Sequence, residues 1–272
     1  MDQYLIVEPD NGSVDLGTAP RMYEVGEIVP AAMPELKGVM PMLYSVEHPE
    51  QQLPSIEVIA ARDKQSGLPP RVCALLETDA SAETLMTHIS DMIALPREDG
   101  GHSVFRFYDP RVVRNLGWVL QPEQLSLMLG PVQRWRHYSG NGWLAMERPA
   151  VAPAERLSLS TAQWATLRRL HLIEQALKSI RDVGEPVDER TSRQLDALFT
   201  KGAQYHLAGE DLAVFAVQGL LVSPNFDRHP DVAAALQPGQ TSSYSEITAQ
   251  WTDENWAVIA QEVARYAWQN NR

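Results

Sequence analysis

Three charged residues near the middle of the chain, Arg106, Asp109 and Arg111, have types and spacing that invite a catalytic interpretation. They lie where a predicted strand gives way to a predicted helix. A structural interpretation is stronger, because Asp109 is a favoured N-cap for a helix that starts at Pro110. A nearby arginine then pairs with a carboxylate or with exposed backbone carbonyls. We therefore expect Arg106, Tyr108, Asp109 and Arg111 to form a structural corner, with Tyr108 beside Arg106 on one face of the strand.

Other signs of enzyme chemistry are absent from the sequence. The seven histidines lack the spacing of helical metal ligands, and no nucleophile elbow, P-loop or dinucleotide-binding glycine motif occurs. Cys73, the single cysteine, lies in an apolar run with no neighbouring base in the sequence, which is typical of a buried thiol. We expect no enzymatic activity, no catalytic residue, no metal and no cofactor. The open alternative is a hydrolase or transferase with a site assembled from scattered residues, such as His102, His137 and Asp109.

The segment from Arg134 to Tyr138 alternates bases with aromatic residues, a pattern that can bind single-stranded nucleic acid. A hairpin strand explains it better, with Trp135 and His137 on one face and the arginines on the other. The chain carries a net charge of −12, whereas nucleic acids and anionic membranes attract basic surfaces. We therefore expect neither nucleic acid nor a membrane as a partner.

The strands and helices that must position these residues are predicted from the spacing of apolar residues and from the turn residues between them. Alternation predicts a strand over 104–108 that carries Phe105 and Phe107 on one face. Asn141-Gly142, between two aromatic segments, predicts a β-hairpin over 132–147. Apolar spacing predicts a helix over 81–93, capped near Ser81. Further strands are expected at Gln3–Val7, Ile56–Ala60 and Val72–Thr78.

A proline-containing stretch over 149–153 predicts a boundary, beyond which the apolar period changes from 2 to 3.6. Helices are expected near 161–180, 188–207, 210–222 and 252–269. The first carries the stripe Leu170, Ile173, Leu177 and Ile180. The last buries Trp256, Ile259, Val263 and Tyr266. The predicted class is α/β (α+β), with an N-terminal mixed-sheet lobe and flanking helices over 1–150 and an all-α lobe over 151–272.

Localisation follows from what the N-terminal segment and the apolar runs contain. No basic leader with an apolar core begins the sequence, and no apolar run reaches the length of a membrane span. We expect a cytoplasmic protein. The acids are concentrated in residues 1–100, which favours a solvated acidic surface and leaves open a partner with a basic segment.

The corner segment FRFYDPR, Phe105 to Arg111, resembles the hallmark of a family of type VI secretion effector chaperones, also called adaptors. Its neighbours occur in the family's order. Arg71–Thr78 and then Ser81–Leu95 precede it, and Glu123-Gln124-Leu125 and Leu129-Gly130-Pro131-Val132 follow it. The resemblance is dense over 71–148, fair over 160–235 and thin over 1–70.

The resemblance implies a non-enzymatic chaperone or adaptor that binds a cognate toxin effector and helps to load it onto the spike of the secretion machine. It carries no catalytic residues. The partner it implies is the effector, through its N-terminal region, and the spike protein is a further candidate. A chaperone needs an apolar binding surface surrounded by polar groups that fix the position of the bound segment. We expect the effector to dock across a groove between the two lobes, with Trp135, Tyr138 and Trp143 of the hairpin as anchors.

Overall fold

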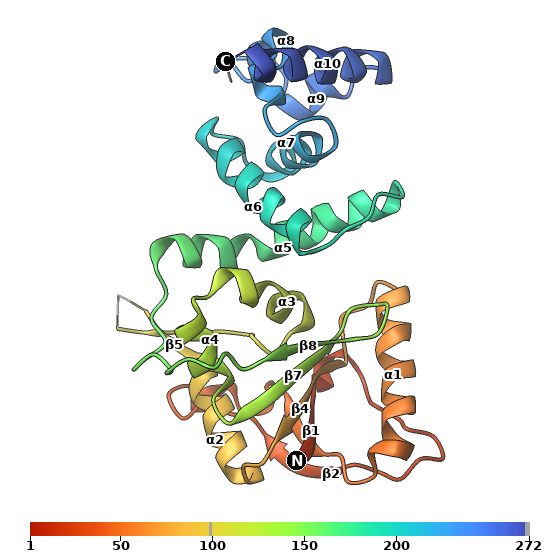
Figure 1. Ribbon diagram of the computed structural model, residues 1–272, viewed down its shortest axis with the longest axis vertical. Helices are drawn as coiled ribbons and strands as arrows, with labels where there is room; N and C mark the ends of the chain where they lie inside the picture. The colour runs from red at the N-terminus through yellow and green to blue at the C-terminus, as the bar shows by residue number, and fades with distance from the viewer. Residues whose placement is uncertain (98–99, 270–272) are drawn as a thin grey trace. The chain divides into compact units, whose positions relative to one another are not determined.

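The computed structural model describes residues 1–97 and 100–269, without the side chains of 266–269 (Figure 1). The chain divides into two compact units, residues 1–163 and 164–272. The first unit is built on a six-stranded sheet, and the second consists of helices. Each unit is described by itself.

The sheet of the first unit has the strand order β2-β3-β1-β4-β7-β8 (Figure 1). Its strands are β1 (Asp2–Val7), β2 (Tyr23–Glu27), β3 (Met42–Ser45), β4 (Val72–Thr78), β7 (Val132–Tyr138) and β8 (Trp143–Glu147). All of its pairings are antiparallel. The predicted mixed α/β class is therefore confirmed, although the sheet is antiparallel rather than mixed in strand direction.

The central strand β4 is buried along its whole length, which fits its nearly continuous apolar run. The strands predicted at Gln3–Val7 and Val72–Thr78 and the hairpin of β7 and β8 are confirmed. Tyr138 pairs with Trp143 at the end of the hairpin. Gly140 and Gly142, rather than Asn141, take the positive φ angles there, 110° and 125°.

Helix α1 (Pro49–Gln65) replaces the strand predicted at Ile56–Ala60, so that prediction is wrong. Its buried residues include Ile56, Ile59, Ala60 and Asp63, which is the spacing of one helix face. A short apolar run fits both periods, and here the helical one governs. The apolar face of α1 packs against Leu5 and other buried residues of the sheet.

The opposite face of the sheet carries Trp135, whose ring lies 5.3 Å from that of Phe107. The helices α2 (Ala82–Ile93), α3 (Pro110–Val119) and α4 (Pro122–Leu129) complete the unit. The predicted caps are confirmed, because Ser81 accepts from the Thr84 N–H at 3.2 Å and Asp109 from the Arg111 N–H at 2.8 Å.

The strand predicted over 104–108 is wrong in extent. Strand β6 (His102–Val104) pairs with β5 (Ala94–Pro96) and ends before Phe105. Two tight backbone contacts follow, from the Phe107 N–H to the Phe105 carbonyl and from the Asp109 N–H to the Arg106 carbonyl. These turns bury Phe105, Phe107 and Tyr108 together and leave Arg106 exposed, so the segment does not alternate between two faces.

Residues 151–163, which the sequence placed with the helical lobe, lie with the first unit. The Val151 carbonyl accepts from the Ser126 hydroxyl at 3.1 Å, and the Gln163 side chain donates to the Val119 carbonyl at 2.9 Å. Leu157 is buried. This segment therefore binds along α3 and α4 after the hairpin.

The second unit contains most of α5 (Thr161–Asp182), then α6 (Glu189–Gln204), α7 (Gly209–Leu221), α8 (Pro230–Ala235), α9 (Tyr244–Thr248) and α10 (Asp253–Gln269). The stripe predicted on the first of these helices is buried, with Leu170, Ile173, Leu177 and Ile180 at most 4% exposed. In α10, Ile259 and Val263 are buried and Trp256 packs against the same core, whereas the Tyr266 side chain is outside the described residues.

Candidate functional site

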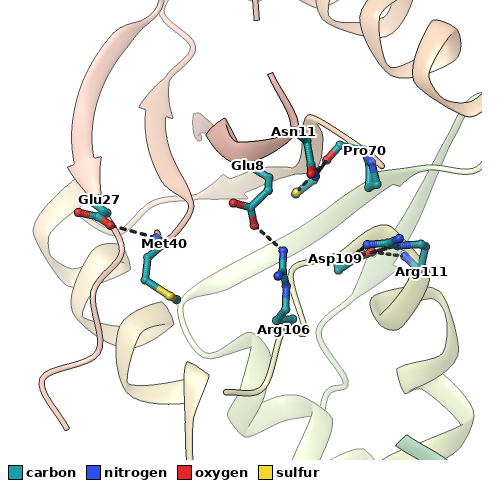
Figure 2. Close-up of polar contacts among 9 residues, drawn as sticks. Glu8, Asn11, Glu27, Met40, Pro70, Arg106, Asp109 and Arg111 are labelled. Carbon is teal, nitrogen blue, oxygen red and sulfur yellow. Dashed lines mark hydrogen bonds and ion pairs between the residues drawn. The ribbon is translucent and has the colours of Figure 1, made fainter. Parts of the chain in front are cut away.

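The corner at 105–111 is the candidate site, because it gathers charged groups around buried carboxylates. Asp109 is 5% exposed and binds Arg111 through contacts that include 3.0 Å from Nε to Oδ1 and 2.6 Å from Nη2 to Oδ2. The same carboxylate caps α3. Figure 2 shows this pair beside the first turn of the helix. One side chain therefore satisfies a backbone donor and a guanidinium at once.

Arg106 makes the second contact of the corner. Its Nη2 lies 2.6 Å from Oε2 of Glu8, which follows β1 and lies 98 residues away in sequence (Figure 2). The Glu8 side chain is 4% exposed and that of Arg106 is 49% exposed. The guanidinium also lies 5.7 Å from the centre of the Tyr108 ring, within reach of a cation–π contact. Arg106 thereby joins the corner to the end of β1.

The electrostatics of Glu8 follow from its burial. Burial raises the pKa of Glu8 above its usual value, and the charge of Arg106 and a hydrogen bond from Tyr108 offset only part of that rise. Burial likewise raises the pKa of Tyr108. The corner thus holds a carboxylate whose charge depends on one half-exposed arginine.

Cys73 lies near this corner and is 2% exposed. Burial, with the negative charges of Asp109 and Glu8, raises the pKa of the Cys73 thiol well above its usual value. Such a thiol stays protonated at neutral pH, which is the reverse of an activated nucleophile.

The scattered residues of the enzyme alternative occupy different environments. His102 is exposed on β6, and Asp109 is engaged by Arg111. His137 is 5% exposed, and neither of its ring nitrogens has a hydrogen-bond partner among the described residues. Burial, with the charges of Arg114 and Lys64, lowers the pKa of His137 to about 4. Within the described ranges, no group of three or more His, Cys, Asp or Glu side chains is placed to hold a metal ion.

The arginines of the hairpin are engaged by carboxylates. Arg136 lies 2.6 Å and Arg134 3.0 Å from the two oxygens of Glu77, whose side chain is 7% exposed. Arg134 also contacts Glu147 on β8 at 2.6 Å. Trp135 and His137 are buried on the other face, as the strand interpretation of this segment predicts. The arginines thus bind acids of the sheet itself.

The three predicted hairpin anchors differ in accessibility. Trp135 is 0% exposed, so it offers no surface to a partner, and its predicted role as an anchor is corrected to a core role. It faces inward because it pairs with the buried Leu76 and packs on Phe107. Tyr138 and Trp143 are half-buried, with ring centres 5.8 Å apart. Their role as anchors stays a prediction.

Sequence reasoning missed the acidic partners Glu8 and Glu77 and the contact at Gly130. Glu8 follows the apolar strand β1, and Glu77 lies within the apolar strand β4. Their arginine partners come from distant segments, so the local sequence around each glutamate does not indicate the pair. Gly130 has φ of +51°, and a Cβ there would lie 2.2 Å from the ring of His88. His88 Nε2 is 2.9 Å from the Met128 carbonyl. The Leu-Gly-Pro turn, noted in the sequence only as a resemblance, packs directly against α2.

Comparison with known proteins gives one match. A family model described as a domain of unknown function (DUF4123) matches residues 30–127, more than a third of the chain, and this span includes residues 105–111 of the corner but not Glu8. No curated protein and no solved structure matches the chain. Among the described residues, no helix combines the length and apolarity needed to cross a membrane.

Proposed function

We propose that this protein is a non-enzymatic adaptor that binds a toxin effector of a type VI secretion system in the cytoplasm. The observation that carries the proposal is the FRFYDPR corner. It resembles the hallmark of effector chaperones, and it lies inside the span matched by DUF4123, a domain associated with such adaptors. In this proposal the corner is architectural, since its buried carboxylates are bound by arginines of the same segment.

The finer parts of the proposal concern the partner. The adaptor binds the N-terminal region of the effector and assists its loading onto the spike, with the spike protein as a further contact. Tyr138 and Trp143 support this, because half-buried aromatic side chains are common anchors of protein interfaces. The enzyme alternative has no specific contact in its favour, since the His137 ring has no partner among the described side chains.

Co-expression with the toxin encoded next to this gene, followed by affinity purification, tests the function. We expect the pair to co-purify and the toxin to become more soluble. Trp143→Ala should weaken the complex about tenfold with the fold retained, a typical loss for an aromatic anchor. Thermal melting controls for the fold, because Trp143 also packs near α1. A toxin that is soluble and secreted without this chain, and that never co-purifies with it, would refute the proposal.

A further inference from the structure

The two edges of the sheet, β2 and β8, are built differently. The register of β2 on β3 shifts between Glu24 and Gly26, and Gly26 has φ of 151°. The carboxylate of Glu27, at the end of β2, accepts from the N–H groups of Gly38 and Met40. Figure 2 shows the contact with Met40. A bulge and acidic residues are features that prevent another strand from pairing with an edge. The β2 edge is therefore protected.

Strand β8 has none of this protection over its first four residues. It pairs with β7 in continuous register from Trp143 to Glu147. Residues 143–146 are uncharged and contain no proline, and Leu144 is 53% exposed. Ala145 is exposed as well. Regular, uncharged edge strands are templates for the addition of another strand.

The hydrogen bonds at the two ends of the hairpin fix which backbone groups of β8 point outward. The Ser139 N–H donates to the Gly142 carbonyl at 2.9 Å, and the Arg148 N–H donates to the Gln133 carbonyl at 3.2 Å. Because antiparallel pairs alternate, Leu144 and Met146 bond to β7. Trp143, Ala145 and Glu147 then direct their N–H and C=O groups away from β7, and none of the hydrogen bonds of the described chain reaches these groups.

We infer that β8 is the edge to which the effector binds, by adding one extended segment to the sheet as a seventh strand. This inference rests on the proposed function. The outward groups of Trp143, Ala145 and Glu147 supply the main-chain hydrogen bonds of such an addition.

The side chains beside this edge define the chemistry of the segment. Leu144 and Met146 share one face, so apolar residues of the effector lie next to them. On the other face the Glu147 side chain, which also pairs with Arg134, is 61% exposed, and the small Ala145 leaves room for a long side chain. Residues 1–163 contain 21 Asp and Glu against 13 Lys and Arg, a net charge of −8. The segment therefore alternates apolar residues with residues that include at least one Lys or Arg.

A second copy of this chain is the competing occupant of the edge. Two copies would bring together chains that each carry a net charge of −12, which disfavours their association. The oligomeric state of the free protein therefore belongs to the test.

Ala145→Pro and Ala145→Val form the matched pair for this test, in the full-length protein with the adjacent-gene toxin as the probe. Proline removes the outward N–H of Ala145 without removing a bond to β7, whereas valine keeps that N–H and suits a strand. We expect Ala145→Pro to weaken toxin binding about tenfold and Ala145→Val to change it less than about threefold. If both variants bind the toxin equally and the wild-type protein still co-purifies with it, the effector does not bind at β8. The proposed adaptor function is then unaffected.

Hydrogen exchange of the wild-type protein is the second measurement. It does not depend on whether the Ala145→Pro variant folds. The amides of Leu144 and Met146 should be protected in the free protein, and those of Ala145 and Glu147 only in the complex. Unprotected Ala145 and Glu147 amides in a saturated complex overturn the inference. A wild-type dimer that Ala145→Pro converts to a monomer also overturns it, by assigning the edge to a second copy. Failure of the wild-type pair to co-purify refutes the adaptor function itself.

Discussion

Glu8 is the buried half of the ion pair that joins the corner to β1, and Arg106 is its half-exposed partner. We expect Arg106→Ala to lower the free energy of unfolding at pH 7 by about 1–3 kcal/mol, because a buried carboxylate loses its counter-charge. Asp109→Ala should cost about 1 kcal/mol through the lost N-cap. Urea denaturation measures both. A variant Arg106→Ala that keeps its stability but loses the effector would instead make Arg106 a contact residue.

The double variant Glu8→Gln/Arg106→Ala is the control for this pair. It should recover most of the lost stability, since a neutral amide needs no counter-charge. The pH dependence has a definite sign. The pKa of Glu8 is already raised by burial and rises further without Arg106, so the penalty of Arg106→Ala should shrink as pH falls and Glu8 takes up a proton. A penalty that is the same at pH 7 and pH 5 would count against the ion pair as its cause.

His137 should make the protein sensitive to acid. Its pKa is lowered from 6.5 to about 4, so the unfolded chain binds a proton between these values that the folded chain does not. Stability should therefore fall as pH drops from 6.5 to 4, by on the order of 2–3 kcal/mol from this residue. His137→Leu should flatten that part of the stability curve, measured by denaturation at several pH values. An unchanged slope in the variant would show that His137 is not buried in its neutral form.

At the scale of elements, the turn between α4 and β7 depends on the absence of a side chain at Gly130. Gly130→Ala should destabilise the first unit by more than 2 kcal/mol, roughly, because both φ and the His88 ring oppose a Cβ. Gly142→Ala is the matched control, since Gly142 also has positive φ but a Cβ at that position would meet no atom within 4 Å. The melting temperature of Gly130→Ala should be well below that of Gly142→Ala. Equal melting temperatures would show that the His88 ring does not oppose a side chain at position 130.

Local signals made some elements predictable and left others hidden. Asp109 and Ser81 cap the helices that follow them, so a few neighbouring residues were enough to locate both caps. The hairpin is local in the same way. The Glu8–Arg106 pair spans 98 residues and depends on the sheet order, which no segment encodes alone. The FRFY segment has strand-like residues, yet after the Phe105 N–H donates to the Ile93 carbonyl the residues that follow fold as turns.

The alternation of residues along a strand predicts which side chains share a face, but not which of the two faces is buried. The alternation of β7 separated Trp135 and His137 from the arginines, yet it did not say which face lies inward. The answer depends on Phe107 and the helices beyond it. Trp135 therefore became core and only Tyr138 and Trp143 stay available as anchors.

At the scale of the whole molecule, the extent of the first unit decides what a truncated protein can do. Residues 151–163 bind to α3 and α4 through Val151 and Gln163, and Leu157 in the same segment is buried. A fragment of residues 1–163 should therefore melt cooperatively, whereas a fragment of residues 1–150 should be less stable by a few kcal/mol, roughly, because it exposes the surface that this segment covers. Circular dichroism melts of the two fragments measure the difference.

Comparison of the 1–163 fragment with the full chain separates the two predicted modes of effector binding. Docking between the lobes needs both units, whereas strand addition to β8 needs only the first, since β8 and β7 both lie within residues 1–163. We expect the folded 1–163 fragment to retain hydrogen-exchange protection of Ala145 and Glu147 by the adjacent-gene toxin, with weaker affinity wherever the helical unit also contributes contacts. Affinity equal to that of the full chain, measured by calorimetry, would rule out docking that needs the helical unit, because the first unit would then account for the whole interface.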